Sequence, residues 1–275
     1  MSWTRTWAWA VAMTVGNVLI LAQGRAQLSL LPETPQAVFA GQDRTVNLRW
    51  HNAGMESVDV QVRARLFQSS GTLAAPLGEQ PPKALRLLPQ QTLLETAQLD
   101  FPTVRAETRF VVQWVTDSQQ VIGRTEVLVY PTNLLTELGL LLDGGDLGLF
   151  DPQAALKPAL RQNGVSFLDL MERPLDDFSG KLAVIGPFPS RAQLRGGFNG
   201  SVRHMARQGA AVVWIQPPRA PDDELRPSFY RLSLGKGALV MVQPELVADF
   251  SVNPLSQLNL IYLCKWALNP APGPD

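Results

Sequence analysis

The stretch Ala210-Ala-Val-Val-Trp-Ile215 is a run of six consecutive apolar residues, and Gln216-Pro217 follows it. A short apolar run with β-branched residues, bounded by proline, is typical of a strand that is buried on both faces. Strands of this kind occur in parallel sheets that helices cover on both sides. The stretch therefore predicts an α/β fold for the part of the chain that surrounds it.

Other apolar runs on either side are predicted to be strands of the same sheet. They are Leu138–Asp143, Val165–Leu170, Lys181–Ile185 and Ala238–Val242. Helices are predicted from the N-cap pair Asp151-Pro152 to Asn163-Gly164, over Arg191–Gln208 and over Pro254–Leu268. Strands joined by crossover helices predict a three-layer, doubly wound and mainly parallel sheet over residues 132–275.

Before Pro131 the apolar residues follow a period of two. The alternating runs include Val46, Leu48 and Trp50, then Val58, Val60 and Val62, and later Phe110, Val112 and Trp114. Turn-forming sequences separate these runs, among them His51-Asn-Ala-Gly54. This alternation is typical of antiparallel strands with one buried face, so residues 27–131 are predicted to form an all-β sandwich.

Residues 1–26 have the pattern of a signal peptide. Arg5 supplies a positive charge, residues 6–22 carry no charged side chain, and Gly24 and Ala26 are small residues where a signal peptidase requires them. Cleavage is predicted before Gln27, which makes the mature chain periplasmic or secreted. An uncleaved membrane anchor is the alternative. No other segment is apolar and long enough to span a bilayer, so no transmembrane span is expected in the mature chain.

Charge and cysteine content limit the partners and bonds that we expect. The chain has 24 Lys and Arg against 24 Asp and Glu, without a basic run, which argues against a nucleic-acid partner. The single cysteine, Cys264, has no intramolecular disulfide partner and is predicted to lie on the buried side of the last helix. We expect no metal and no cofactor.

Two family resemblances add to this interpretation. Ala40-Gly-Gln42, an alternating strand and then His51-Asn-Ala-Gly54 resemble the immunoglobulin-like modules of bacterial surface and periplasmic proteins. Asp143-Gly144-Gly145, the strand and turn from Lys181 to Pro187, and the stretch Gly209–Ile215 resemble the class I glutamine amidotransferase-like domain, which is flavodoxin-like. The resemblance implies a flavodoxin-like fold for residues 132–275.

The amidotransferase resemblance also implies where a nucleophile would stand. Active members carry a Cys at the elbow that follows the strand matching Ala210–Ile215, and it pairs with a later His. Here the elbow reads Ile215-Gln216-Pro217-Pro218, which contains no Cys, Ser or Thr. No His follows Cys264. We therefore expect a degenerate, non-catalytic domain in an extracytoplasmic binding or scaffolding protein.

Candidate ligand-binding residues are those predicted to leave the carboxyl ends of strands, where open α/β sheets bind their ligands. They are Asp143, Gly144, Gly145 and Asp146 after the first strand, Gly186, Pro187 and Ser190 after the third, and Gln216 after the fourth. Glycines let a ligand approach the backbone, and carboxylates are able to bind a metal or accept hydrogen bonds from sugar hydroxyls. Ser190 also fits the role of a helix cap.

Two other functions remain open from the sequence. One is a hydrolase of envelope or extracellular carbohydrate that uses Asp143 and Asp146. The other is an accessory subunit of an envelope transport or motility complex. The expected partner is accordingly another envelope protein or a glycan.

Overall fold

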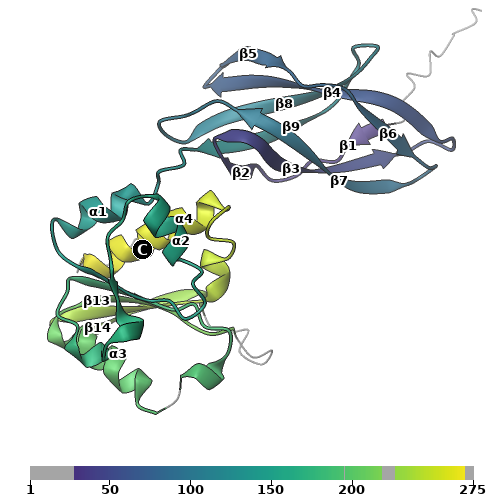
Figure 1. Cartoon of the computed structure of the whole chain (residues 1–275). Helices are drawn as coiled ribbons and strands as arrows, with labels where there is room; N and C mark the ends of the chain where they lie inside the picture. Colours follow the sequence, from purple (N-terminus) through teal and green to yellow (C-terminus); the bar gives the residue numbers. More distant parts are fainter. Residues whose placement is uncertain (1–27, 195, 219–226, 270–275) are drawn as a thin grey trace, which may run out of the picture.

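The computed structural model describes residues 28–194, 196–218 and 227–269, and it is rich in β-strands with a few helices and mixed sheets (Figure 1). The predicted signal peptide, residues 1–26, lies outside the described residues. Within them, no helix combines the length and the apolar character that a membrane span needs.

The first part of the chain, residues 28–130, contains strands only. Their bounds are β1 Leu28–Leu30, β2 Gln36–Phe39, β3 Gly41–Asn52, β4 Val58–Ser70, β5 Leu73–Glu79, β6 Lys83–Leu87, β7 Thr92–Phe101, β8 Thr108–Thr116 and β9 Val121–Tyr130. One sheet has the order β1-β3-β7 and the other the order β2-β9-β8-β4-β5, with β6 pairing with β4. All pairs are antiparallel except β2 with β9.

The alternating residues of both sheets meet in one hydrophobic cluster. Trp50 from β3 and Trp114 from β8 are both buried, and their rings lie edge to face with centroids 5.7 Å apart. This placement confirms the predicted inward phase of these strands. Such a contact between large aromatic side chains, made across the two sheets, fixes their separation.

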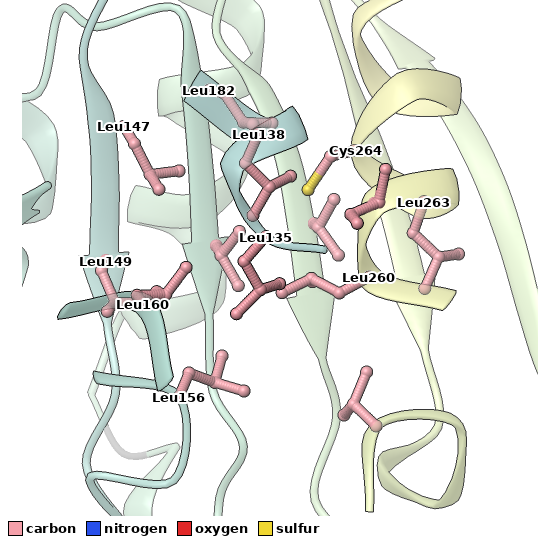
Figure 2. Close-up of a cluster of buried hydrophobic side chains, with 14 of the residues drawn as sticks. Leu135, Leu138, Leu147, Leu149, Leu156, Leu160, Leu182, Leu260, Leu263 and Cys264 are labelled. Carbon is pink, nitrogen blue, oxygen red and sulfur yellow. The ribbon is translucent and has the colours of Figure 1, made fainter. Parts of the chain in front are cut away.

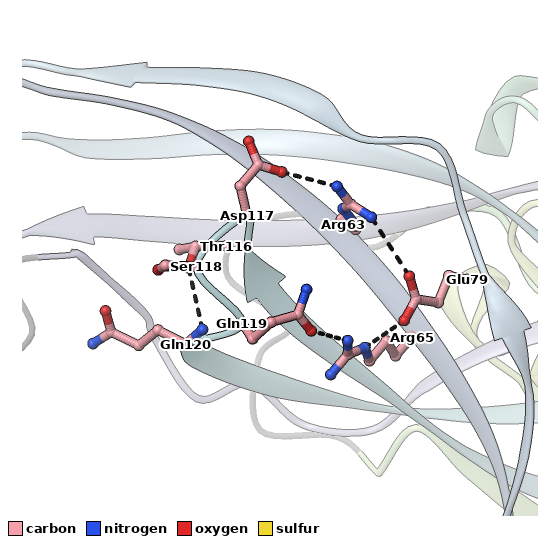
Figure 3. A network of polar contacts seen from close by, with 8 residues as sticks. All are labelled: Arg63, Arg65, Glu79, Thr116, Asp117, Ser118, Gln119 and Gln120. Carbon is pink, nitrogen blue, oxygen red and sulfur yellow. Dashed lines mark hydrogen bonds and ion pairs between the residues drawn. The ribbon is translucent and has the colours of Figure 1, made fainter.

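Polar side chains hold the edge of the larger sheet together (Figure 3). Arg65 of β4 donates to Glu79 of β5 at 2.6 Å and to Gln119 in the β8–β9 turn. Arg63 donates to Asp117 in the same turn at 3.1 Å. The two arginines therefore tie β5 and the β8–β9 turn to the central strand between them, although each exposed pair stabilises by less than about 1 kcal/mol.

The second part, residues 131–269, surrounds a six-stranded sheet with the order β11-β10-β12-β13-β15-β14. Its elements are α1 Thr136–Leu142, β10 Leu147–Phe150, α2 Lys157–Gln162, β11 Leu168–Asp169, β12 Leu182–Ile185, α3 Phe198–Gln208, β13 Ala211–Ile215, β14 Phe229–Leu234, β15 Gly237–Val242 and α4 Pro254–Leu268. These elements are joined in part by short 3₁₀ helices. They are η1 Leu170–Glu172, η2 Leu175–Asp177, η3 Arg191–Gln193 and η5 Pro244–Val247. Neighbouring strands are parallel except β14, which is antiparallel to β15.

The predicted strand at Leu138–Asp143 is wrong, because this segment belongs to helix α1. Leu138 and Leu142 are four residues apart and buried on one side of the helix, whereas Leu140 is 80% exposed. A run of leucines this short does not distinguish a strand from a helix by its pattern alone. The first strand of the sheet is instead β10, which is separated from the helix by four residues and was not predicted.

The other predicted elements are confirmed in part. The strands at Lys181–Ile185, Ala210–Ile215 and Ala238–Val242 are confirmed to within a residue, and α4 has the predicted bounds. The strand predicted over Val165–Leu170 shrinks to β11. The helix predicted over Arg191–Gln208 begins only at Phe198, since its N-cap Gly197 has a left-handed φ of 80°. Strand β14 was not predicted.

Hydrophobic clusters cover both faces of this sheet. Residues of α1, α2 and α4 belong to one cluster and residues of α3 to the other. Figure 2 shows Cys264 of α4 within the first cluster, beside leucines of α1 and α4. The thiol is fully buried, as predicted, and burial raises the pKa of Cys264 well above its usual value of 9.0.

We expect the Cys264 thiol to be unreactive toward Ellman's reagent in the native protein and to react fully in concentrated urea, because only unfolding exposes it. The thiol stays protonated in the folded state but ionises in the unfolded chain above its ordinary pKa. Unfolding free energy should therefore fall as pH rises above that value. Stoichiometric labelling of the native protein would contradict this burial; a Cys264→Ala variant supplies the background signal.

Candidate functional site

The carboxyl ends of the five parallel strands lie at one edge of the sheet. The chain visits β10, β11 and β12 in that order, but β10 stands between the other two in the sheet. The segments that leave β10 and β12 therefore run in opposite directions, and α2 and α3 contribute to different clusters. A crevice at such a switch point is where open α/β sheets bind ligands.

A groove of about 580 Å³ lies at this edge, and we call it the carboxyl-edge groove. It extends from the loop after β10 to the segment between β15 and α4. Its lining residues are Gln153, Ala155, Pro187, Pro244, Glu245, Val247, Ala248, Asp249, Phe250, Ser251 and Val252. One sequence-predicted site residue, Pro187, is among them.

Aromatic rings fill the other side of this edge. Phe198, at the start of α3, lies with its ring centroid 5.3 Å from that of Phe150 and 5.5 Å from that of Phe188. Phe150 ends β10, and Phe188 follows β12. These rings fill the carboxyl edge on the face of the sheet that α3 covers. The groove therefore lies on the face that α4 covers.

Asp151, which follows β10, is almost fully buried, with 2% exposure. Its carboxylate accepts hydrogen bonds from the backbone N–H groups of Ala155, Leu156 and Lys157 at 2.8–3.0 Å. The sequence predicted an N-cap at Asp151, but α2 begins only at Lys157. The carboxylate still satisfies donors at the start of that helix, so its acceptor capacity is used inside the protein.

Asp169, which ends β11, is the second carboxylate at the end of a parallel strand. Lys157 Nζ donates to its Oδ2 at 2.6 Å, and the backbone N–H of Met171 donates to Oδ1 at 3.1 Å. The hydrogen bond from Lys157 is the main reason that the pKa of Asp169 lies below its ordinary value. This carboxylate too is engaged in internal bonds.

Glutamines stand where two further strands end. Gln243, after β15, is 6% exposed and donates through Nε2 to Oε1 of Gln216, after β13, at 2.9 Å. Pro217, which follows Gln216, is buried. Within the described residues, no group of three or more His, Cys, Asp or Glu side chains is arranged to hold a metal ion.

The structure places half of the predicted site residues elsewhere. Asp143, Gly144, Gly145 and Asp146 form the turn from α1 into β10, before the strand instead of after it. Asp143 takes a left-handed φ of 48°, and the Gly145 N–H donates to the Leu142 carbonyl, as at many helix ends. Because the predicted strand is a helix, this turn lies at the opposite, amino edge of the sheet.

The other predicted residues do lie at the carboxyl edge. Gly186 and Pro187 follow β12 and are joined by a cis peptide bond. Ser190 precedes η3, but its side chain makes no capping hydrogen bond, so its predicted capping role is not realised. Gln216 is bonded to Gln243, as described above.

The segment that lines most of the groove, residues 244–252, was not predicted from the sequence. A signal was present, since Gln243-Pro244 directly follows the apolar run Ala238–Val242, which was predicted as a strand. The rule that placed Gln216 at the carboxyl edge places this segment there as well.

Comparisons with known proteins leave the family open. No family model and no curated protein matches the chain. Among solved structures, it is similar to a Pseudomonas fluorescens alkylpurine DNA glycosylase (13% identity, 38% of this chain, 31% of that chain, TM-score 0.30). It is also similar to a Niemann-Pick type C2 protein from Japanese carpenter ant (11%, 39%, 96%, 0.30) and to a Bifidobacterium adolescentis beta-glucosidase (12%, 37%, 17%, 0.28). TM-scores this low assign neither fold family nor function.

Proposed function

We propose that this chain is an exported, non-catalytic binding or scaffolding protein. In this proposal residues 1–26 are a signal peptide, residues 27–131 an immunoglobulin-like sandwich, and residues 132–275 a glutamine amidotransferase-like domain without its nucleophile. The single observation that carries the proposal is the hydrogen bonding of the Asp151 and Asp169 carboxylates. These two carboxylates, which stand at the carboxyl ends of β10 and β11, are both committed to internal hydrogen bonds.

The architecture supports the two domain assignments. The sheet order β11-β10-β12-β13, with hydrophobic clusters on both faces, agrees with a doubly wound flavodoxin-like domain. The two sheets of the first part share one cluster, as the sheets of an immunoglobulin-like sandwich do.

The chemistry of the elbow supports the absence of catalysis. An amidotransferase elbow needs a thiol or hydroxyl nucleophile beside a base, and Gln216-Pro217 provides neither. The only thiol of the chain, Cys264, lies inside the core, where burial keeps it protonated. A protonated, enclosed thiol cannot attack a substrate.

The test is an assay of the mature protein, from Gln27 to Asp275, for hydrolysis of glutamine and of an activated aryl ester. We expect release of ammonia and of the phenol to stay at the rate of the buffer blank. Cys264→Ala and Asp151→Asn variants serve as controls for contaminating enzymes. Turnover above the blank that a single substitution at the carboxyl edge abolishes would refute the proposal.

The carbohydrate hydrolase considered above was inferred from a predicted position of Asp143 and Asp146 at the carboxyl edge, and the two residues do not lie there. Asp143 and Asp146 are exposed at the amino edge, away from the switch point. If glycan hydrolysis were nevertheless detected, an Asp143→Asn/Asp146→Asn variant should retain it. The accessory-subunit function remains a form of the proposed one, in which the partner is a protein held stably.

A further inference from the structure

We propose that the carboxyl-edge groove binds an extended segment of another protein that carries a Lys or Arg next to apolar residues. This inference rests on the proposed binding function and names the chemistry of the partner. It follows from the charges, the apolar surface and the rigidity of the groove.

The groove is acidic. Glu245 and Asp249 are exposed in its lining, and neither forms an ion pair within the part of the chain that the structure describes. No Lys, Arg or His is among the described residues that line the groove. A cation that enters it therefore meets two carboxylates without a competing positive charge, whereas an anion would be repelled.

The rest of the lining offers apolar surface. Val247 and Phe250 are buried beneath the groove and belong to the core cluster, while Pro187 and Pro244 are half-buried. Val252 is 73% exposed and adds apolar surface to the lining. An aliphatic stem or a neighbouring apolar residue of the partner would cover this surface.

The groove is a preformed structure. Three side chains of α4 donate to carbonyl groups of residues 244–252: Asn259 to Leu246 at 2.9 Å, Gln257 to Phe250 at 3.0 Å, and Ser256 to Ala248. Gln257 and Ser256 are themselves buried. Because alternate carbonyls are held by the helix, the segment loses little conformational freedom when a partner binds.

The open form of the groove favours a protein segment over a small molecule. Small-ligand sites are concave and enclose most of the ligand. This groove is instead open to solvent, with Ala248, Asp249, Ser251 and Val252 exposed along it. An extended protein segment can bind with only one face against the groove, because a few anchoring side chains provide most of its affinity.

The test uses an array of short random peptides, each made in four versions with Arg, Lys, norleucine or Glu at one central position. The full mature protein is applied in low-salt buffer, and the best binders are remeasured by fluorescence anisotropy. We expect Arg and Lys versions to bind, and norleucine and Glu versions of the same peptides to bind at least about fivefold more weakly.

Two variants with the same change in charge locate the site. Glu245→Gln/Asp249→Asn should weaken binding of the Arg peptides roughly five- to tenfold and flatten its salt dependence. Asp146→Asn/Asp177→Asn removes two exposed carboxylates at the amino edge and should leave binding unchanged. Absence of binding, equal binding of Glu versions, or equal weakening by both variants would overturn the inference.

The same samples distinguish this inference from the proposed function. Each bound peptide is recovered and its mass measured. Intact peptides that do not prefer Arg or Lys would overturn only the assignment of a cationic partner. A peptide cleaved or deamidated by wild-type protein would refute the non-catalytic proposal on which the inference rests.

Discussion

Replacing Asp151 by Ala should lower the unfolding free energy of the second part by about 4 kcal/mol. The carboxylate is buried and accepts three backbone hydrogen bonds at the start of α2, and Ala would leave those donors without a partner. Each hydrogen bond to a charged group contributes about 1.5–3 kcal/mol, and the three are not additive. Urea unfolding followed by the circular dichroism of the helices measures the change, since the described helices all lie in the second part.

The matched control for this substitution is Asp146→Ala. Asp146 is an exposed aspartate in the turn before β10, so its replacement should change the unfolding free energy by no more than about 0.5 kcal/mol. Asp151→Asn keeps one acceptor oxygen, so its loss of unfolding free energy should lie between those of Asp151→Ala and Asp146→Ala. A loss below about 1 kcal/mol for Asp151→Ala would show that the carboxylate does not organise the loop between β10 and α2.

Replacing Gly186 by Ala should destabilise the same part by about 3–5 kcal/mol. Gly186 has a φ of 97°, which side chains rarely adopt, and an added Cβ would lie 2.4 Å from the backbone oxygen of Ile215. Strained backbone costs about 1–3 kcal/mol and a forced shift in a packed core a similar amount. Thermal unfolding should show a midpoint lowered by roughly 10 °C or more.

Gly139→Ala is the control for this second substitution. Gly139 lies in α1, and a Cβ added there meets no atom within 4 Å. Alanine in a helix should raise stability by up to about 1 kcal/mol. If Gly186→Ala unfolded at the same temperature as wild type, Gly186 would not lie close to the Ile215 carbonyl as the structure describes.

Much of the second part was predictable because its central strands are continuous apolar runs. The strand Ala211–Ile215 and its neighbours Leu182–Ile185 and Gly237–Val242 are buried almost throughout, and helix α4 begins with Pro254 after the N-cap Asn253. The strands on one side of the sheet were harder, since β11 has only two residues and Gly148 interrupts the four-residue apolar run of β10. In segments this short, tertiary packing decides the conformation.

The incorrect prediction of the first strand also explains why half of the predicted site residues lie away from the site. Placing a strand at Leu138–Asp143 moved the Asp143–Asp146 turn to the wrong edge of the sheet. Pro187 was found because the strand before it was correct. Glu245 and Asp249 lie in a segment of 3₁₀ helix and turns without periodicity, and only its position after β15 marks it as part of the site.

The most direct test of the central claim, that the carboxyl-edge groove is the binding site, is hydrogen exchange measured by mass spectrometry. The mature protein would be compared alone and in complex with the partner captured from an envelope extract. Slower exchange in residues 244–252 and 186–190, with other segments unchanged, is the predicted result. Protection confined to the amino-edge residues 143–146 and 176–181, or to the first part of the chain, would contradict it.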